Sequence, residues 1–337
     1  MNKNNKAIIS HLSEIFSQHK AENSYVGIRL INMIEGAQRI ELPSFPRQIQ
    51  IETTNICNHN CNFCAYITME RPKRHMDPNL FRRLVQEAYD CGAREIGLFA
   101  GAEPLTCKWI VDYVYFCREI GYEYMYISTN GSLPNQEKFR QILEAGLSSI
   151  KFSVNGGNRE TYLEVHGKDH FDRIIDNIKF VSAYRKKVSQ KVYLGVSFVG
   201  TDKTRHTFQD LIHLLDEYVD EIIYYEASNQ SGQMPELPAP PYRDCSLPFN
   251  KLHISREGYL KACCNDYENL LALVDLNHTP LKEAWESNIF REFRRKHINN
   301  DLGGTLCANC IRGCHEKPKP LNNILTHSGK NIREIVE

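Results

Sequence analysis

The stretch TTNICNHNCNFCAY (residues 53–66) places Cys57, Cys61 and Cys64 at the spacing C-x3-C-x2-C. Cysteine thiolates are ligands both for zinc and for iron–sulfur clusters. A closed structural zinc site normally has four protein ligands, so three cysteines leave one coordination position to be filled. His59 within the loop or a distant cysteine would complete a zinc site. On a four-iron cluster, by contrast, three cysteines would leave one iron free to bind another molecule.

The cysteine loop belongs to a chain of 337 residues, which is long enough for one large domain with an appendage or for two domains. Lys and Arg together number 41, and Asp and Glu together also number 41, so the formal net charge is zero. A balanced charge gives no electrostatic reason to expect nucleic acid or an anionic membrane as the main partner. The short basic run RPKRHM (71–76) is predicted to be a solvated loop.

The sequence predicts a cytoplasmic protein. No apolar run approaches the ~20 residues that a membrane span requires. The first twenty residues lack an apolar segment followed by a small-residue cleavage site, and Ile8, Leu12 and Phe16 instead fit one face of a helix. The cytoplasm keeps thiols reduced, so the twelve cysteines are not expected to form a disulfide framework.

Three of the cysteines have no partner at a metal-ligand spacing. Cys91, Cys107 and Cys117 lie in segments with helical patterns. Free cysteine packs as a small hydrophobic side chain, so we expect these three to be buried.

Strand and helix patterns alternate along the chain. Six segments have the composition of strands: 47–54, 95–101, 124–131, 149–156, 192–200 and 221–228. Helical patterns lie between them at 78–91, 107–120, 135–146, 170–187 and 205–216. Parallel strands need crossover connections, which are nearly always right-handed, so this order predicts a parallel sheet. We expect an α/β fold with a (β/α)6 partial TIM-like barrel, whose working loops follow the C-terminal ends of the strands.

Glycine and short polar residues follow the predicted strands. The cysteine loop comes after the first, and the later strands are followed by GAEPL, STNG, SVNGGNRE, SFVGTD and EASNQSG. Glycine allows the backbone to approach a ligand closely. Because these loops share one edge of the predicted sheet with three cysteines, they predict a cofactor cleft.

With these motifs the chain resembles the radical SAM superfamily, in which C-x3-C-x-aromatic-C holds a [4Fe–4S] cluster. The matching residues are Cys57, Cys61, Phe63 and Cys64. In that family S-adenosylmethionine (SAM) chelates the fourth iron, so the resemblance implies that the cofactor is the missing ligand. It also implies that a reduced cluster cleaves SAM and that the resulting radical abstracts a substrate hydrogen.

GAEP is similar to the GGEP motif of the family, whose backbone and acidic residue hold the methionine amino group. STNG and FSVNG resemble the motifs after the third and fourth strands. The resemblance implies cofactor contacts at Phe63, Gly101, Ala102, Glu103, Pro104, Ser153 and Asn155. One position departs from the pattern, because His166 stands in EVHG where many relatives carry an arginine.

The last third of the chain has a second cysteine pattern, C-x12-G-x4-C followed by CANCIRGC (307–314). A treble-clef-like zinc site would suit such cysteines. The pattern is also similar to the SPASM/twitch extension of the radical SAM family, which binds auxiliary iron–sulfur clusters. The number of thiolates then implies one auxiliary [4Fe–4S] cluster. Its expected ligands are Cys245, Cys263, Cys307 and Cys310, with Cys314 as a substitute for one of the last pair.

One cysteine stands outside this expected ligand set. Cys264 adjoins the ligand Cys263 and is either a spectator or, like Cys314, a hydrogen donor to a substrate radical. Between the two parts of the pattern, one amphipathic helix is expected around Trp285, Phe290 and Phe293, with these aromatic side chains in the core.

Four segments are predicted: an N-terminal helical segment (1–45), a radical SAM partial barrel (46–235), a SPASM/twitch domain (236–325) and a tail (326–337). The resemblance implies oxidation or epimerisation of a carbohydrate- or aminocyclitol-like metabolite. The alternative is modification of a peptide, for which the first 45 residues look too short to form a recognition domain. A non-catalytic zinc-binding protein is the third interpretation. A flavodoxin- or ferredoxin-type reductant is the expected protein partner.

Overall fold

The computed structural model describes residue 29 and residues 36–133, 135–240 and 244–326. Contacts divide the chain into two compact units, which we describe separately. The first unit contains segments 1–36, 57–63 and 103–227, and the second contains segments 37–56, 64–102 and 228–337, as far as they are described. The helix expected in the first twenty residues and most of the tail lie outside the described residues. The predicted domain boundaries stay a prediction.

The first unit contains a parallel sheet of four strands in the order β6-β5-β4-β3. The strands are β3 (Tyr124–Thr129), β4 (Ser149–Ser153), β5 (Tyr193–Gly200) and β6 (Glu221–Glu226). Seven of the eight residues of β5 are buried, as expected of a parallel strand covered on both faces.

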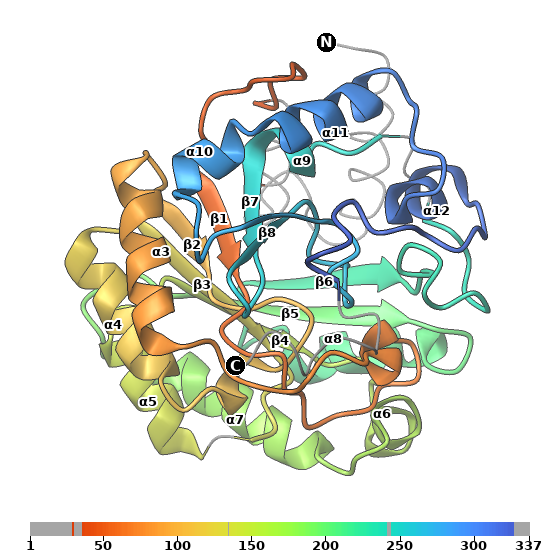
Figure 1. The fold of residues 1–337 in the computed structure, drawn as a ribbon. Coiled ribbons are helices and arrows are strands. Elements are labelled where there is room, and N and C mark those ends of the chain that lie inside the picture. Colours follow the sequence, from red (N-terminus) through yellow and green to blue (C-terminus); the bar gives the residue numbers. More distant parts are fainter. Residues whose placement is uncertain (1–28, 30–35, 134, 241–243, 327–337) are drawn as a thin grey trace. The chain divides into compact units, whose positions relative to one another are not determined.

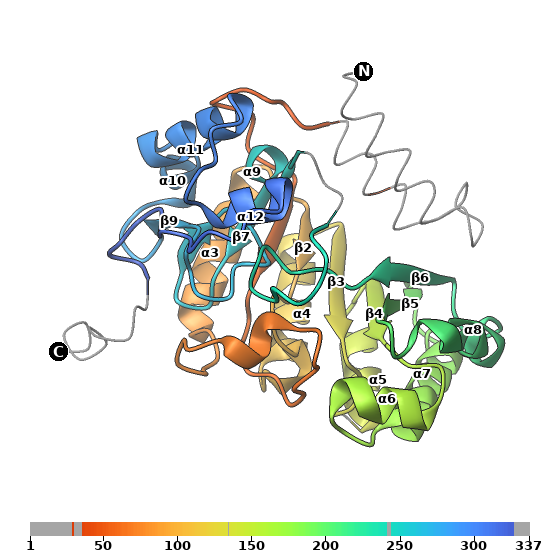
Figure 2. The same cartoon turned by 90° about the vertical axis from the view of Figure 1, so that its right-hand side faces the viewer.

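Helices follow the strands of the first unit. They are α4 (Ile110–Ile120), α5 (Gln136–Glu144), α6 (Arg159–His166), α7 (Phe171–Tyr184) and α8 (Phe208–Leu215), with short 3-10 helices η3 (Pro104–Thr106) and η4 (Arg205–Thr207). Figure 2 shows α5 and α7 next to each other beside β4 and β5. α6 was not predicted; Asn158 caps its first turn, and Gly167, at φ 66°, ends it. This helix end places His166 at the edge of the candidate site.

The second unit contains a five-stranded sheet in the order β2-β1-β7-β8-β9. The strands are β1 (Gln48–Ile51), β2 (Glu95–Gly97), β7 (Lys251–Ile254), β8 (Tyr259–Lys261) and β9 (Ala272–Asp275). β1 pairs in parallel with β2 and with β7, and β7, β8 and β9 are antiparallel to one another. β1 and β7 therefore lie side by side although they are far apart in the sequence (Figure 1).

The helices of the second unit are α3 (Pro78–Asp90), α9 (Leu247–Asn250), α10 (Leu281–Trp285), α11 (Asn288–Ile298) and α12 (Leu306–Arg312), with η2 (Ala65–Thr68). The single amphipathic helix expected near Trp285 is two helices, because Ser287 caps a new first turn at α11. Trp285, Phe290 and Phe293 are buried, which confirms the packing role predicted for them. None of the helices in the described part of the chain is long and apolar enough to cross a bilayer.

The interpretation of residues 71–76 as a solvated loop is wrong for Met76, which is buried, and for Arg71. Arg71 is 2% exposed, and its guanidinium forms ion pairs of 2.8 Å with both Glu52 and Glu257. A charge can be buried when its partners satisfy it in this way. Lys73 and Arg74 are exposed as predicted.

The cysteines without ligand spacing are mostly in the core. Cys107 and Cys117 are buried, as predicted. Cys91 directly follows the last residue of α3 and is only half-buried, so the burial predicted for it is incomplete.

Candidate iron–sulfur and cofactor sites

Hydrogen bonds attach the part of the cysteine loop that belongs to the first unit to the end of β3 and to α6. Asn58 donates to the Ser132 hydroxyl at 2.9 Å and accepts from the Asn130 amide at 2.8 Å. The backbone N–H of Asn62 donates to the carbonyl oxygen of Val165 at 3.0 Å. These bonds hold the backbone on both sides of Cys61.

His166 lies against Cys61. The Cys61 Sγ is 3.1 Å from His166 Nδ1, and the Phe63 ring meets the imidazole edge-on with ring centroids 6.0 Å apart. The Tyr162 ring stacks on the imidazole at a centroid distance of 4.1 Å. Burial lowers the pKa of His166 well below its ordinary value, so the imidazole is neutral. The position where the chain departs from the family pattern is therefore part of the site.

The same corner also offers ligands to a single metal ion. Ligand atoms of His59, Cys61 and His166 all lie within 4.8 Å of one another. Burial lowers the pKa of His59 to about 4, so its imidazole is also neutral and able to bind a metal. Two imidazoles and a thiolate suit zinc. These three side chains therefore support the interpretation of the cysteine loop as part of a zinc site.

Glu103 is a buried carboxylate, 3% exposed, held by the end of β3. It accepts hydrogen bonds from the Thr129 hydroxyl and the Asn130 N–H, both at 2.6 Å, and from the Leu105 N–H at 3.0 Å. Burial raises its pKa to about 7 although these bonds oppose the shift. Within the described ranges, no Lys or Arg forms an ion pair with it, so no basic side chain balances the charge of the ionised carboxylate.

Two more predicted cofactor residues end β4 and its loop. Asn155 is buried; its Oδ1 accepts from the Val199 N–H at 2.8 Å, and its Nδ2 lies 3.3 Å from His166 Nε2. Ser153 is half-buried and accepts a hydrogen bond from Ser197 at 3.4 Å. The structure thus connects Asn155 through His166 to Cys61.

In the second unit, Tyr267 connects Cys64 with Gly101. Its hydroxyl lies 3.6 Å from Cys64 Sγ, and a Cβ placed on Gly101 would come within 2.6 Å of its ring. Only glycine therefore permits this packing without movement of the ring. Ala102 follows Gly101 and is half-buried, and Pro104, in the first unit, begins η3. Tyr267 was missed by sequence reasoning, although it lies only four residues after Cys263.

Five thiols gather in the second unit, and we call them the auxiliary cysteine group: Cys245, Cys263, Cys264, Cys307 and Cys310. Cys263 forms a hydrogen bond with Cys264 and interacts electrostatically with Cys245 and Cys307. Cys310 interacts in the same way with Cys245, Cys264 and Cys307. The structure therefore brings together the four residues expected as ligands.

Protonation within this group is uneven. Burial raises the pKa of Cys245 to about 12 and that of Cys307 well above its ordinary value. The hydrogen bond from Cys263 lowers the pKa of Cys264 to about 6. The Ser231 hydroxyl forms a hydrogen bond with Cys310. Buried thiols crowded in this way become thiolates readily only with a bound metal to balance their charge.

The remaining predicted ligand, Cys314, lies beyond the end of α12. Gly313, at φ 64°, ends that helix, and Cys314 follows it in an irregular segment. Cys264 interacts with Cys263 and with Cys310 and is the fifth thiol of the auxiliary cysteine group.

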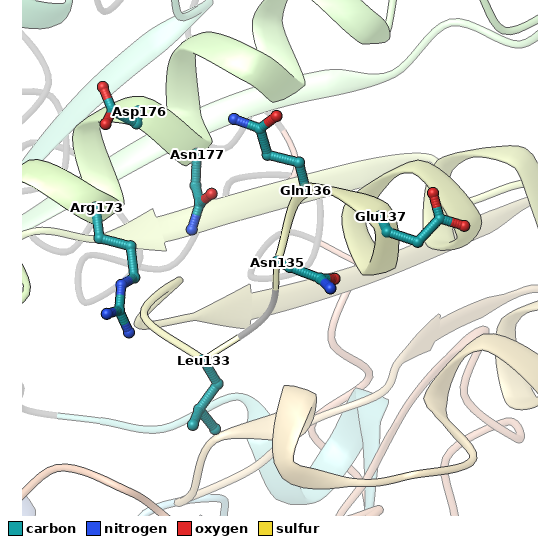
Figure 3. Close-up of a pocket in the computed structure, with 7 residues that line it drawn as sticks. All are labelled: Leu133, Asn135, Gln136, Glu137, Arg173, Asp176 and Asn177. Atoms are coloured by element: carbon teal, nitrogen blue, oxygen red, sulfur yellow. The ribbon is translucent and has the colours of Figure 1, made fainter.

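A pocket of about 740 Å³ lies in the first unit beside the loop that follows β3 (Figure 3). Six of the seven residues that line it have polar side chains, among them Arg173 and Asn177 from α7. Arg173 donates to the Ser132 carbonyl oxygen and Asn177 to that of Gly131. The pocket contains none of the predicted site residues, but two side chains that line it hold the STNG loop in place.

Comparison with known proteins identifies the class. A family model described as the radical SAM superfamily matches residues 51–215, and a model for SPASM, an iron–sulfur cluster-binding domain, matches residues 245–311. An α/β chain with a parallel sheet core and these two cysteine patterns is typical of enzymes that combine SAM with iron–sulfur clusters. The chain belongs to the radical SAM superfamily and carries a SPASM domain. Its cofactors are SAM, a [4Fe–4S] cluster and auxiliary iron–sulfur.

Curated relatives are distant. An uncharacterized protein of Methanocaldococcus jannaschii is 28% identical over 210 residues, which cover 61% of this chain and 67% of the relative. A probable GTP 3',8-cyclase of Saccharolobus islandicus is 24% identical over 266 residues, covering 68% of this chain and 86% of the relative.

Solved structures share the fold. BtrN in complex with AdoMet and 2-DOIA aligns at a TM-score of 0.56 with 17% identity, covering 83% of this chain and 99% of BtrN. SuiB of Streptococcus suis bound to the precursor peptide SuiA aligns at 0.63 with 14% identity, covering 85% of this chain and 79% of SuiB. These likenesses confirm the fold expected from the sequence, a partial barrel with a C-terminal SPASM domain.

Proposed function

We propose that the protein is a radical SAM oxidoreductase that dehydrogenates a small hydroxyl-bearing metabolite of the carbohydrate or aminocyclitol kind. The observation that carries the proposal is the auxiliary cysteine group. Four of its thiols suffice for one fully ligated cluster, and such a cluster can accept an electron. Oxidation of an alcohol removes two electrons, so a dehydrogenase needs an acceptor for the second one.

The metal ligands follow from this proposal. Cys57, Cys61 and Cys64 hold the cluster that binds SAM, on the strength of their spacing and the family motif. When bound, this cluster supplies the electron that cleaves SAM, and the resulting radical removes a hydrogen atom from the substrate. The auxiliary ligands are Cys245, Cys263, Cys307 and Cys310; Cys314 stays the predicted substitute for one of the last two.

Glu103 supports the assignment of the SAM site. A buried carboxylate without a cation is unfavourable, and the methionine ammonium of SAM would provide one. Two carboxylate oxygens offer about four lone-pair positions, and Glu103 uses three, so one acceptor position is left for the ammonium. Gly101, Ala102 and Pro104 complete this motif, and Phe63, Ser153 and Asn155 are the proposed contacts to the rest of the cofactor.

The likeness to BtrN favours a small substrate. The alignment covers 99% of BtrN, whose structure contains 2-DOIA, but only 79% of SuiB, whose structure contains a peptide. The alignment thus includes nearly the whole of BtrN, and this supports a substrate of similar size. A flavodoxin- or ferredoxin-type protein is the proposed source of electrons.

Two other reactions, modification of a peptide and epimerisation, are each supported by one observation. The higher TM-score to SuiB favours modification of a peptide. Epimerisation needs a hydrogen donor on the opposite face of the substrate, and Cys264 is a fifth thiol beside the proposed auxiliary ligands.

The first experiment counts iron and sulfide per chain after anaerobic reconstitution. Wild type should contain about eight irons, which corresponds to two [4Fe–4S] clusters. Replacing Cys57, Cys61 and Cys64 with alanine should leave about four, as should replacing Cys245, Cys263 and Cys307. Cys91→Ala is the matched control and should retain all of them. A wild-type value of about four, falling to zero in the first variant, would remove the electron acceptor and with it the dehydrogenase proposal.

The second experiment tests the substrate class. Reconstituted enzyme, SAM and a reductant are incubated with aminocyclitols and sugars that carry deuterium at the carbinol carbon. Deuterium transfer to 5'-deoxyadenosine with formation of a ketone supports the proposal. Transfer with inversion and no ketone indicates an epimerase. Transfer only from peptide substrates assigns the protein to the peptide-modifying group.

A further inference from the structure

Three side chains of the first unit form a chain of hydrogen bonds that ends on a proposed cluster ligand. The chain begins at the N–H of Val199 on β5, passes through Asn155 and His166, and ends at Cys61. Asn155 and His166 are 2% and 1% exposed, so water does not compete with these bonds. Each contact restricts which atom of the next residue can donate.

The donor and acceptor in each hydrogen bond of this chain can be assigned by starting from the N–H of Val199. A backbone N–H can only donate, so the Asn155 atom that faces Val199 at 2.8 Å is the amide oxygen. The Asn155 NH2 group therefore faces His166 Nε2 at 3.3 Å, and because NH2 also only donates, Nε2 accepts. A neutral imidazole carries one proton, which this contact assigns to Nδ1. Nδ1 is the atom that lies 3.1 Å from Cys61 Sγ.

Packing keeps the imidazole in this orientation. The Tyr162 ring stacks on it and the Phe63 ring meets it edge-on. The Gly167 cap fixes the end of α6, from which the ring projects. The N–H group is therefore held toward the sulfur before any metal binds.

We propose that His166 is a positioning residue that donates its Nδ1–H to the Cys61 thiolate and raises the reduction potential of the SAM-binding cluster. This inference rests on the proposed ligand role of Cys61, because a thiolate ligand has no proton of its own and can only accept. Hydrogen bonds to cluster sulfur withdraw negative charge, and they are among the features that set the potentials of iron–sulfur clusters. The reduced cluster carries the extra negative charge, so the bond favours reduction.

The test is an anaerobic redox titration of the full-length reconstituted protein, followed by EPR in the absence of SAM. The contribution of the auxiliary cluster is measured in the Cys57, Cys61 and Cys64 triple alanine variant and subtracted. His166→Leu, which keeps an apolar side chain but no donor, should have a more negative midpoint potential than wild type. His166→Asn can place an N–H near the position of Nδ1 and should restore most of the difference.

Tyr162→Phe is the matched control, because it keeps the stacked ring and should leave the potential unchanged. Equal potentials in wild type and His166→Leu would overturn the proposal. So would a His166→Asn potential as negative as that of His166→Leu, because then the N–H group is not responsible. Iron analysis of the same samples distinguishes a failure of the hydrogen-bond proposal from a failure of the ligand role proposed for Cys61. An iron content that does not fall in the triple alanine variant rejects the ligand assignment instead.

A second measurement applies if His166→Leu fails to bind the cluster. Wild type labelled with 15N-histidine is reduced and studied by pulsed EPR. A coupling between a histidine nitrogen and the SAM-binding cluster, lost in His166→Asn, supports the hydrogen bond. Absence of that coupling in wild type overturns the proposal.

Discussion

At the scale of the residue, the described site is organised by a few buried polar side chains whose neighbours determine what they can bind. Glu103 accepts hydrogen bonds from the end of β3 and its loop, but no cation pairs with it among the described residues. His166 has both ring nitrogens occupied, one toward Cys61 and one toward Asn155. Glu103 can therefore bind a cationic group of a cofactor, and His166 holds Cys61, a proposed ligand of the cluster.

We expect Glu103→Gln to weaken SAM binding by about 10- to 100-fold, because a hydrogen bond to a charged group contributes roughly 1.5–3 kcal/mol. Equilibrium dialysis of the reconstituted protein with labelled SAM measures the change. Glu160→Gln, on the exposed first turn of α6, is the control and should bind as wild type does. Unchanged affinity in Glu103→Gln would contradict the role given to GAEP.

Glu103 should also make the stability of the SAM-free protein depend on pH. Burial raises its pKa from 4.5 to about 7, so the folded protein holds this proton more tightly than the unfolded chain does. The resulting stabilisation is complete below about pH 4.5 and is lost as the pH rises through about 7, a loss of up to about 3 kcal/mol. The free energy of unfolding of wild type should fall relative to that of Glu103→Gln over this window. A constant difference would show that folding does not raise the pKa of Glu103.

Sequence reasoning at this scale found residues defined by spacing and missed those defined by packing. The cysteines and GAEP lie in short motifs whose spacing is visible in the sequence. Tyr267 reaches Cys64 and Gly101 only through the tertiary fold, so no local pattern identifies it. His166 was noticed as a departure from the family pattern, but its bond to Cys61 required the structure.

At the scale of the element, loops and helix ends position the site. The six predicted strands are present as β1 to β6, each shorter than its predicted segment, whereas β7, β8 and β9 were not predicted. α6 was missed because SVNGGNRE, with two glycines, was interpreted as a loop, whereas Asn158 begins a helix directly after them. The loop at 71–76 shows the opposite error, because a basic composition concealed that Arg71 is buried between two carboxylates.

Gly101→Ala tests the contact between GAEP and the SPASM segment. The added methyl group would lie 2.6 Å from the Tyr267 ring, so one of them must move, at an expected loss of about 1–3 kcal/mol in stability. Gly303→Ala, where no atom lies within 4 Å of the new methyl group, is the control. Thermal unfolding of the single variants and of Gly101→Ala with Tyr267→Ala measures the coupling. The double variant should recover part of the loss, and simple additivity would contradict direct contact.

Arg71→Met should be among the most destabilising substitutions in the second unit. It leaves the buried carboxylate of Glu52 without its ion pair and leaves Arg256 as the partner of Glu257, and breaking a buried pair in this way costs about 3–5 kcal/mol. It also removes the donor that holds the Tyr267 carbonyl at 2.6 Å. Lys73→Met, two residues away and exposed, should change the melting temperature little. Equal melting temperatures for the two variants would contradict the burial of this ion pair.

At the scale of the whole molecule, the boundary between the two compact units does not follow chain order. The second unit combines early segments with the whole of the described C-terminal third. Each unit contains part of the cysteine loop, Cys57 and Cys61 in one and Cys64 in the other. Alternation of strands and helices predicted the fold class, but a pattern read along the sequence contains no information on this division. Such information comes from long-range pairing alone.

The pairing of β1 with β7 has a consequence for how the protein is made. Ile51 and Ile254 are partners in the register of β1 and β7. One edge of β1 therefore stays unpaired until β7 has been synthesised, roughly 200 residues and about 10–40 s later. During that interval the nascent chain has an unpaired strand edge, and such edges promote aggregation of prematurely released fragments.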